Sequence, residues 1–88
     1  MWYTYLLYSR SQDKFYIGVT NDLKRRIEEH SRGKTQTTSR MKDFELAYYE
    51  ASKNEIDAKN RERQLKTGFG RGYIRKRLQN YIKGVEIV

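Results

Sequence analysis

The sequence predicts an α+β fold in which a small three-stranded antiparallel sheet is flanked by three helices, in the order β-β-α-β-α-α. Two short segments rich in tyrosine and β-branched residues open the chain, and apolar residues recur with a helical period in three later segments. No internal repeat or linker interrupts the 88 residues, so we expect a single domain over residues 1–88.

The first two strands are expected at residues 2–9 and 15–20, joined as a β-hairpin by a short polar turn. Successive side chains of a strand point to opposite faces of the sheet. This alternation places Tyr5 on one face of the first strand, and it places Tyr16 and Gly18 together on one face of the second.

The first helix is expected directly after the hairpin. Thr20 or Asn21 can cap its start, and Gly33 is a typical residue at a helix C-terminus. At about 100° per residue, Arg26 and His30 lie on or beside the apolar face of this helix. Both side chains are therefore expected to face the sheet.

A third strand is expected at residues 44–50, followed by a second helix that begins with a capping box at Ser52. Glu62 lies on the apolar face of this helix, between Ala58 and Leu65. A carboxylate on an apolar face is unfavourable unless a cation or hydrogen bonds compensate. Glu62 is therefore a candidate metal ligand, and a salt bridge to a neighbouring basic residue is the alternative.

The glycine-rich segment 68–72 is expected to separate the second helix from the third. Ile74, Leu78 and Val85 then share the apolar face of the third helix. The glycines also allow backbone amides to approach a phosphate, although a turn between two helices explains them more simply.

The charge of the chain favours a polyanionic partner. Nineteen Lys and Arg stand against eleven Asp and Glu, and the formal net charge is +8. Binding of phosphates releases counterions, so nucleic acid is the first candidate, and a basic solvated surface is the alternative. The residues expected to bind nucleic acid are Lys34, Arg40, Lys66, Arg71, Arg75 and Lys76.

The residue types exclude several kinds of site. With no cysteine and one histidine, the chain offers no disulfide, no thiolate zinc site and no cluster of histidines, so any metal is expected on oxygen ligands. We expect no small-molecule cofactor. No apolar stretch has the length of a membrane span or a signal peptide, so we expect a cytoplasmic protein without membrane contact.

The combination of these features resembles the GIY-YIG nuclease family, over essentially residues 2–83. The second motif of the family name is intact as Tyr16-Ile17-Gly18. The first is degenerate, because Tyr3-Thr4-Tyr5 keeps only the tyrosine at its third position. The closest resemblance is to small stand-alone members. The other residues that match the family pattern are Arg26, His30 and Glu62.

The resemblance implies a metal-dependent endonuclease that hydrolyses DNA phosphodiester bonds, in a setting such as DNA repair or recombination. It implies that Glu62 binds one Mg²⁺ or Mn²⁺ ion and that Arg26 holds the scissile phosphate. Tyr5 is implied as the general base or water-orienting group and Tyr16 as its hydrogen-bonded companion, and these two roles are exchangeable. His30 completes the implied catalytic set.

The small domain leaves no segment to contact base edges, so we expect little sequence specificity. A partner protein that targets the domain to its substrate is consistent with this small size. Two other functions use the same residues. A non-catalytic nucleic-acid-binding module with this fold would bind through the same basic surface. RNA binding would use the same charge and aromatics, but the sequence has no RNA-recognition motif.

Overall fold

The structure, a computed structural model, describes residues 1–33 and 43–84. The α+β class with one three-stranded antiparallel sheet is confirmed. The expected positions Lys34, Arg40 and Val85 lie outside the described residues. The elements in chain order are β1 (Trp2–Ser9), β2 (Lys14–Thr20), α1 (Leu23–Ser31), β3 (Phe44–Ser52), α2 (Glu55–Leu65), α3 (Gly68–Arg77) and α4 (Gln79–Lys83).

The sheet has the strand order β2-β1-β3, and β1 pairs antiparallel with both neighbours. Alternate side chains of β1 reach opposite faces, as the sequence predicts. The Thr4 hydroxyl donates to the carbonyl of Ala58 in α2 at 2.9 Å, whereas the Tyr5 hydroxyl contacts His30 in α1. Because β1 is central, β2 has a free edge.

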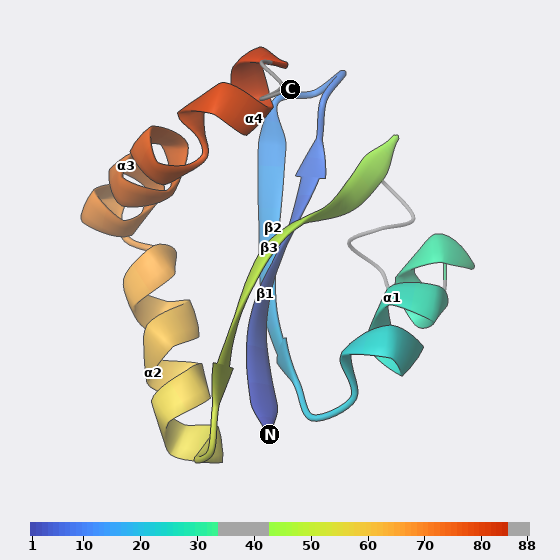
Figure 1. Ribbon diagram of the computed structural model, residues 1–88, viewed down its shortest axis with the longest axis vertical. Coiled ribbons are helices and arrows are strands. Elements are labelled where there is room, and N and C mark those ends of the chain that lie inside the picture. The colour runs from blue at the N-terminus through green and yellow to red at the C-terminus, as the bar shows by residue number, and fades with distance from the viewer. Residues whose placement is uncertain (34–42, 85–88) are drawn as a thin grey trace.

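Helices cover both faces of the sheet. Figure 1 shows α1 on one face and α2, α3 and α4 on the other. The hydrophobic core lies on the second of these faces, and each buried side chain there contributes about 1.5–3 kcal/mol to stability. Its buried members are Leu6, Ile17, Leu65 and Ile74.

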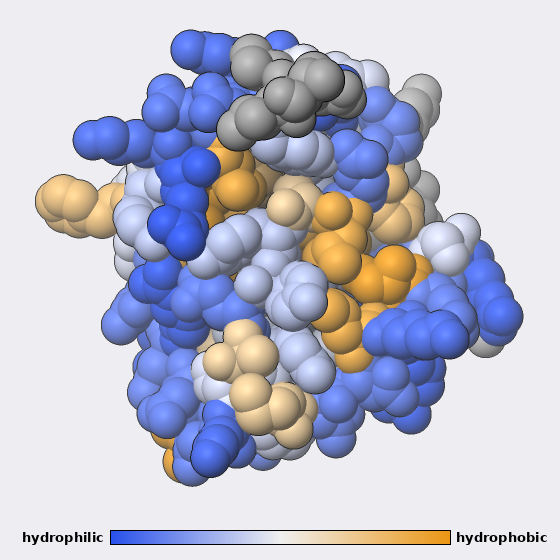
Figure 2. Space-filling view, viewed as in Figure 1, coloured by the Kyte–Doolittle hydropathy of each residue, from blue (hydrophilic) through white to orange (hydrophobic). Residues whose placement is uncertain are grey.

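The face that carries α1 retains apolar surface. Figure 2 shows apolar side chains gathered between β3 and α1, on a face that is otherwise mostly hydrophilic. Leu23 and Ile27 of α1 and Leu46 of β3 line this region. Among the described residues, no helix has the length and apolar character that crossing a membrane requires.

Two helix starts differ from the predicted caps. Asp22 caps α1 and Asn54 caps α2, where the sequence favours Thr20 or Asn21 and Ser52. Ser52 is the last residue of β3, so its backbone is committed to the sheet. Each observed cap accepts hydrogen bonds from free amides of the first helical turn, which is the geometry that stabilises a helix start.

The glycine-rich segment is part of a helix, and the prediction that it forms a break is wrong. Thr67 Oγ1 accepts a hydrogen bond from the Gly70 amide at 3.1 Å and caps α3, which begins at Gly68. A Cβ on Gly70 would collide with the backbone of α2 at Gln64. The glycine therefore lets two helices meet closely. Leu78 then separates α3 from the short α4.

Candidate active site

Tyr5 is central to the candidate site, and Gly18 makes room for its ring. The two residues lie opposite each other in β1 and β2. A Cβ at position 18 would lie 2.5 Å from the Tyr5 hydroxyl oxygen, closer than a side-chain carbon can approach. A larger residue at this position would therefore displace the Tyr5 ring.

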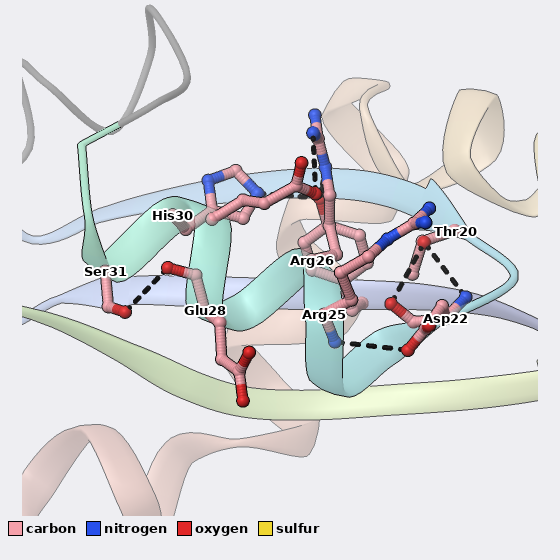
Figure 3. Close-up of polar contacts among 9 residues, drawn as sticks. Thr20, Asp22, Arg25, Arg26, Glu28, His30 and Ser31 are labelled. Atoms are coloured by element: carbon pink, nitrogen blue, oxygen red, sulfur yellow. Dashed lines mark hydrogen bonds and ion pairs between the residues drawn. The ribbon is translucent and has the colours of Figure 1, made fainter.

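The Tyr5 hydroxyl joins two side chains of α1. It accepts a hydrogen bond from Arg26 Nε–H at 3.3 Å and shares a second one with His30 Nε2 at 2.8 Å. The two partners lie four residues apart, so they share one helix face. Figure 3 shows Arg26 and His30 on one side of α1, with Glu28 on the other. This network attaches α1 to the sheet.

Burial controls the protonation of this network. Burial raises the pKa of Tyr5 to about 12, although the hydrogen bond from Arg26 acts in the opposite direction. Burial also lowers the pKa of His30, with a smaller contribution from the charge of Arg26, so the imidazole is neutral at pH 7. The hydrogen bond to Tyr5 raises the pKa of Arg26, which stays charged. Tyr5 is therefore held as a neutral phenol.

Glu62 projects from α2, and its carboxylate forms an ion pair with Lys66, one turn later on the same helix. Its carboxylate lies 3.4 Å from Lys66 Nζ, and its side chain keeps 27% of its surface exposed. An exposed ion pair of this kind contributes little to stability. Glu62 thus forms the salt bridge considered as the alternative and also remains open to solvent.

A cavity of about 460 Å³ brings the candidate residues together around the free edge of β2. Tyr16 and Arg26 reach it from the α1 side of the sheet, and Glu62 reaches it from α2. His30 is completely buried and is joined to the cavity through Tyr5. The residues that line the cavity are Tyr5, Tyr16, Gly18, Val19, Arg26, Lys59, Glu62, Arg63 and Lys66.

The two tyrosines differ in exposure. Tyr5 is 0% exposed, whereas Tyr16 is half-buried. The Tyr16 ring lies 6.2 Å from the Tyr5 ring and 5.2 Å from the His30 ring, measured between centroids. Tyr16 therefore contacts the buried network and is also open to the cavity. A buried phenol with a raised pKa is a poor base, which disfavours Tyr5 as the group that handles water.

The basic residues expected to bind nucleic acid occupy different places. Lys66 lines the cavity, and Arg71 and Arg75 line a groove beside it. Arg75 is already engaged, because its Nη1 lies 3.0 Å from Asp13 Oδ1 and its Nη2 donates to the Asp13 carbonyl at 3.1 Å. Lys76 is exposed on α3 and lines neither space.

Two residues that line the cavity are not among the site residues predicted from the sequence. Lys59 and Arg63 stand three residues before and one residue after Glu62 on α2, and both line the cavity. Lys59 lies three residues before Glu62, and Arg63 lies four residues after Lys59, so helical spacing was the available signal. Among the described residues, no group of three or more histidines and carboxylates is placed to bind a metal ion. Glu62 is the carboxylate of the cavity.

The antiparallel sheet, the helices on its two faces and the basic cavity define an α+β domain with an open, basic site. A family model described as the GIY-YIG catalytic domain matches residues 1–77. The chain therefore belongs to the GIY-YIG family and has a nuclease-type fold, as the tyrosine motifs indicate. Nucleases of this family are in general endonucleases that use divalent metal ions. Neither the curated proteins nor the solved structures compared with the chain gave a match.

Proposed function

We propose that this protein is a metal-dependent endonuclease that hydrolyses DNA phosphodiester bonds with little sequence specificity, in DNA repair or recombination. The observation that carries the proposal is the cavity in which Tyr16, Arg26 and Glu62 meet. Family membership supports the endonuclease class. The basic residues around the cavity favour an anionic substrate, because they attract phosphates.

Arg26 is the residue that would hold the scissile phosphate. Its Nε is bound to the Tyr5 hydroxyl, and its side chain is 34% exposed at the cavity. Its Nη1 is 3.7 Å from the Glu29 carboxylate, which is a weak contact. A guanidinium held through Nε keeps its outer N–H groups for two phosphate oxygens. Tyr5 and His30 are then positioning residues that fix the direction of this guanidinium.

In this proposal Tyr16, rather than Tyr5, orients the attacking water, and Tyr5 takes the companion role. Tyr16 is the tyrosine that is half-open to the cavity, so its hydroxyl can contact a water molecule. The Tyr16 hydroxyl would orient this water by a hydrogen bond. Tyr5, which is buried and neutral, packs beside the Tyr16 ring.

The donor chemistry of the cavity fits one Mg²⁺ or Mn²⁺ ion held by Glu62. These ions bind to hard oxygen ligands, and Mg²⁺ commonly takes one or two carboxylates while waters and substrate phosphates fill its other positions. A bound ion of this kind stabilises negative charge on the phosphate and promotes formation of hydroxide. The ammonium group of Lys66 competes with it for the Glu62 carboxylate.

A cleavage panel tests the proposal. Supercoiled plasmid, flap and single-stranded substrates are incubated with Mg²⁺, with Mn²⁺ and with EDTA. We expect cleavage with a metal and none with EDTA, and a loss of at least about 10²-fold in Glu62→Ala and in Arg26→Ala. Glu28→Ala is the matched control, because it removes an exposed carboxylate on the far side of α1 and should leave cleavage unchanged.

One observation favours a non-catalytic nucleic-acid-binding module as the second candidate. Lys66 pairs with Glu62 in the structure, so this carboxylate has a counterion without a metal. That function predicts binding of DNA at low salt and no cleavage with either metal. A folded wild-type protein that cuts none of the substrates would overturn the nuclease proposal. Cleavage that persists equally in Glu62→Ala and in Arg26→Ala would show that this cavity does not carry the activity.

A further inference from the structure

A second groove adjoins the cavity along the free edge of β2. Its volume is about 510 Å³, and Tyr16 and Lys66 line both spaces, so the two are adjacent. Figure 1 shows α2 and α3 along one face of the sheet, with α3 nearer the turn between β1 and β2. The groove leads from the cavity toward this turn, where the contact between Arg75 and Asp13 closes its far end.

The groove has a basic rim and an apolar floor. Lys14 stands on the β2 side and Arg71 on the α3 side, and Phe15 and Ile17 supply apolar surface between them. Arg75 does not offer a free cation here, because its guanidinium lies 5.4 Å from the Phe15 ring centroid and is bound to Asp13. The rim and floor are therefore fixed in place at that end.

The side chains of Lys14 and Arg71 make no polar contacts with the rest of the described structure. In the part of the chain that the structure describes, neither side chain forms an ion pair or a hydrogen bond, and both are exposed. Two cations that face one groove without a counterion favour an anionic ligand. The alternation of basic and aromatic groups is typical of sites for single-stranded nucleic acid, where phosphates follow the cations and bases lie on aromatic rings.

The dimensions also favour one strand over two. The groove has a volume of about 510 Å³, which is the size of a single ligand pocket. A groove of this size can hold a short stretch of one strand, whereas a duplex would have to bring both backbones to it. The free edge of β2 adds unpaired backbone groups that can donate to or accept from a single strand.

We propose that this groove binds an unpaired strand next to the cleaved bond, so that the preferred substrate carries a single-stranded segment beside the point of cleavage. Lys14 and Arg71 bind its phosphates, and Lys66 lies where the strand leaves the catalytic cavity. The inference rests on the proposed nuclease function, and it names the substrate class of that site.

Binding in EDTA tests the inference without cleavage. Fluorescence anisotropy compares a blunt duplex with duplexes of equal phosphate number that carry a 5′ or a 3′ overhang. We expect wild-type protein to bind one of the overhang duplexes several-fold more tightly than the blunt duplex. The double variant Lys14→Ala/Arg71→Ala should lose this preference, with roughly tenfold weaker overhang binding, because two phosphate contacts are removed.

Salt dependence adds a second readout. Each phosphate contact on a single strand contributes about 0.7 to the slope of log affinity against log salt, so the double variant should lose about 1.4 of that slope on the overhang substrate. The matched control is Lys24→Ala/Arg32→Ala, which removes two exposed cations from α1 and its end. This control should keep the preference for the overhang.

Two results would overturn the inference. One is equal binding of blunt and overhang duplexes by wild-type protein, and the other is an equal loss on both substrates in the groove variant. Failure of the nuclease proposal appears separately, as absence of cleavage with metal while the overhang preference in EDTA persists. Thermal unfolding of both double variants within a few degrees of wild type excludes a folding defect.

Discussion

Replacing Tyr5 with phenylalanine removes the hydroxyl that hydrogen-bonds to the buried His30 and to the half-buried Arg26. The Tyr5→Phe variant keeps the ring that packs against Gly18 and deprives His30 Nε2 and Arg26 Nε of their shared partner. His30 is completely buried, so water cannot replace the lost oxygen. A buried polar atom that loses its hydrogen bond in this way destabilises the folded state by about 1–3 kcal/mol. Arg26 is partly exposed and can turn to water, so its share is small.

We therefore expect Tyr5→Phe to lower the free energy of unfolding by about 1–3 kcal/mol, measured by urea denaturation. Tyr49→Phe is the matched control, because this tyrosine is 51% exposed on the same sheet, and its change should stay within about 0.5 kcal/mol. A double-mutant cycle with His30→Leu should give a non-zero coupling energy. A loss in Tyr5→Phe no larger than in Tyr49→Phe would refute the buried network.

Further predictions concern the same site. Gly18→Ala should destabilise the protein by about 1–3 kcal/mol in urea, because its Cβ meets Tyr5, whereas Gly72→Ala, with open space around it, should not. The pKa of His30 is lowered in the folded protein, so the unfolded chain binds more protons below about pH 6.5 and stability should fall from pH 7 to pH 5. His30→Leu should flatten that part of the pH curve, and an unchanged slope would contradict the assignment. Lys66→Met should tighten Mn²⁺ binding to Glu62 by about twofold or more in calorimetry, because it removes the competing ammonium, and weaker binding would count against it.

The strands were predictable because their pattern is local. Alternation along 2–9 and 15–20 places Tyr5 on one face of β1 and places Tyr16 and Gly18 together on one face of β2, whereas the pairing of Tyr5 with Gly18 comes from the structure. The helix caps were less predictable, since several residues near each helix start can serve and only the backbone geometry chooses Asp22 and Asn54. The start of α3 depends on contact with α2, which no local pattern contains.

The sequence predicts which way the side chains of the candidate site face better than it predicts how exposed each side chain is. Helical spacing places Arg26 and His30 on the face toward the sheet. That Tyr5 is buried and Tyr16 half-open depends on how α1 packs over β1, because α1 covers one ring and leaves the other at the edge. The groove beside β2 likewise requires residues that are distant in sequence, such as Lys14 and Arg71.

The central claim is that Glu62 serves the chemical step rather than the binding of DNA. The most direct measurement is the single-turnover cleavage rate of wild-type protein and Glu62→Gln at saturating Mn²⁺, with DNA affinity measured in parallel and Glu28→Gln as the control. The account predicts DNA affinity within a few-fold of wild type and a rate lowered by about 10²-fold or more in Glu62→Gln alone. A rate that stays equal to wild type in Glu62→Gln would contradict it.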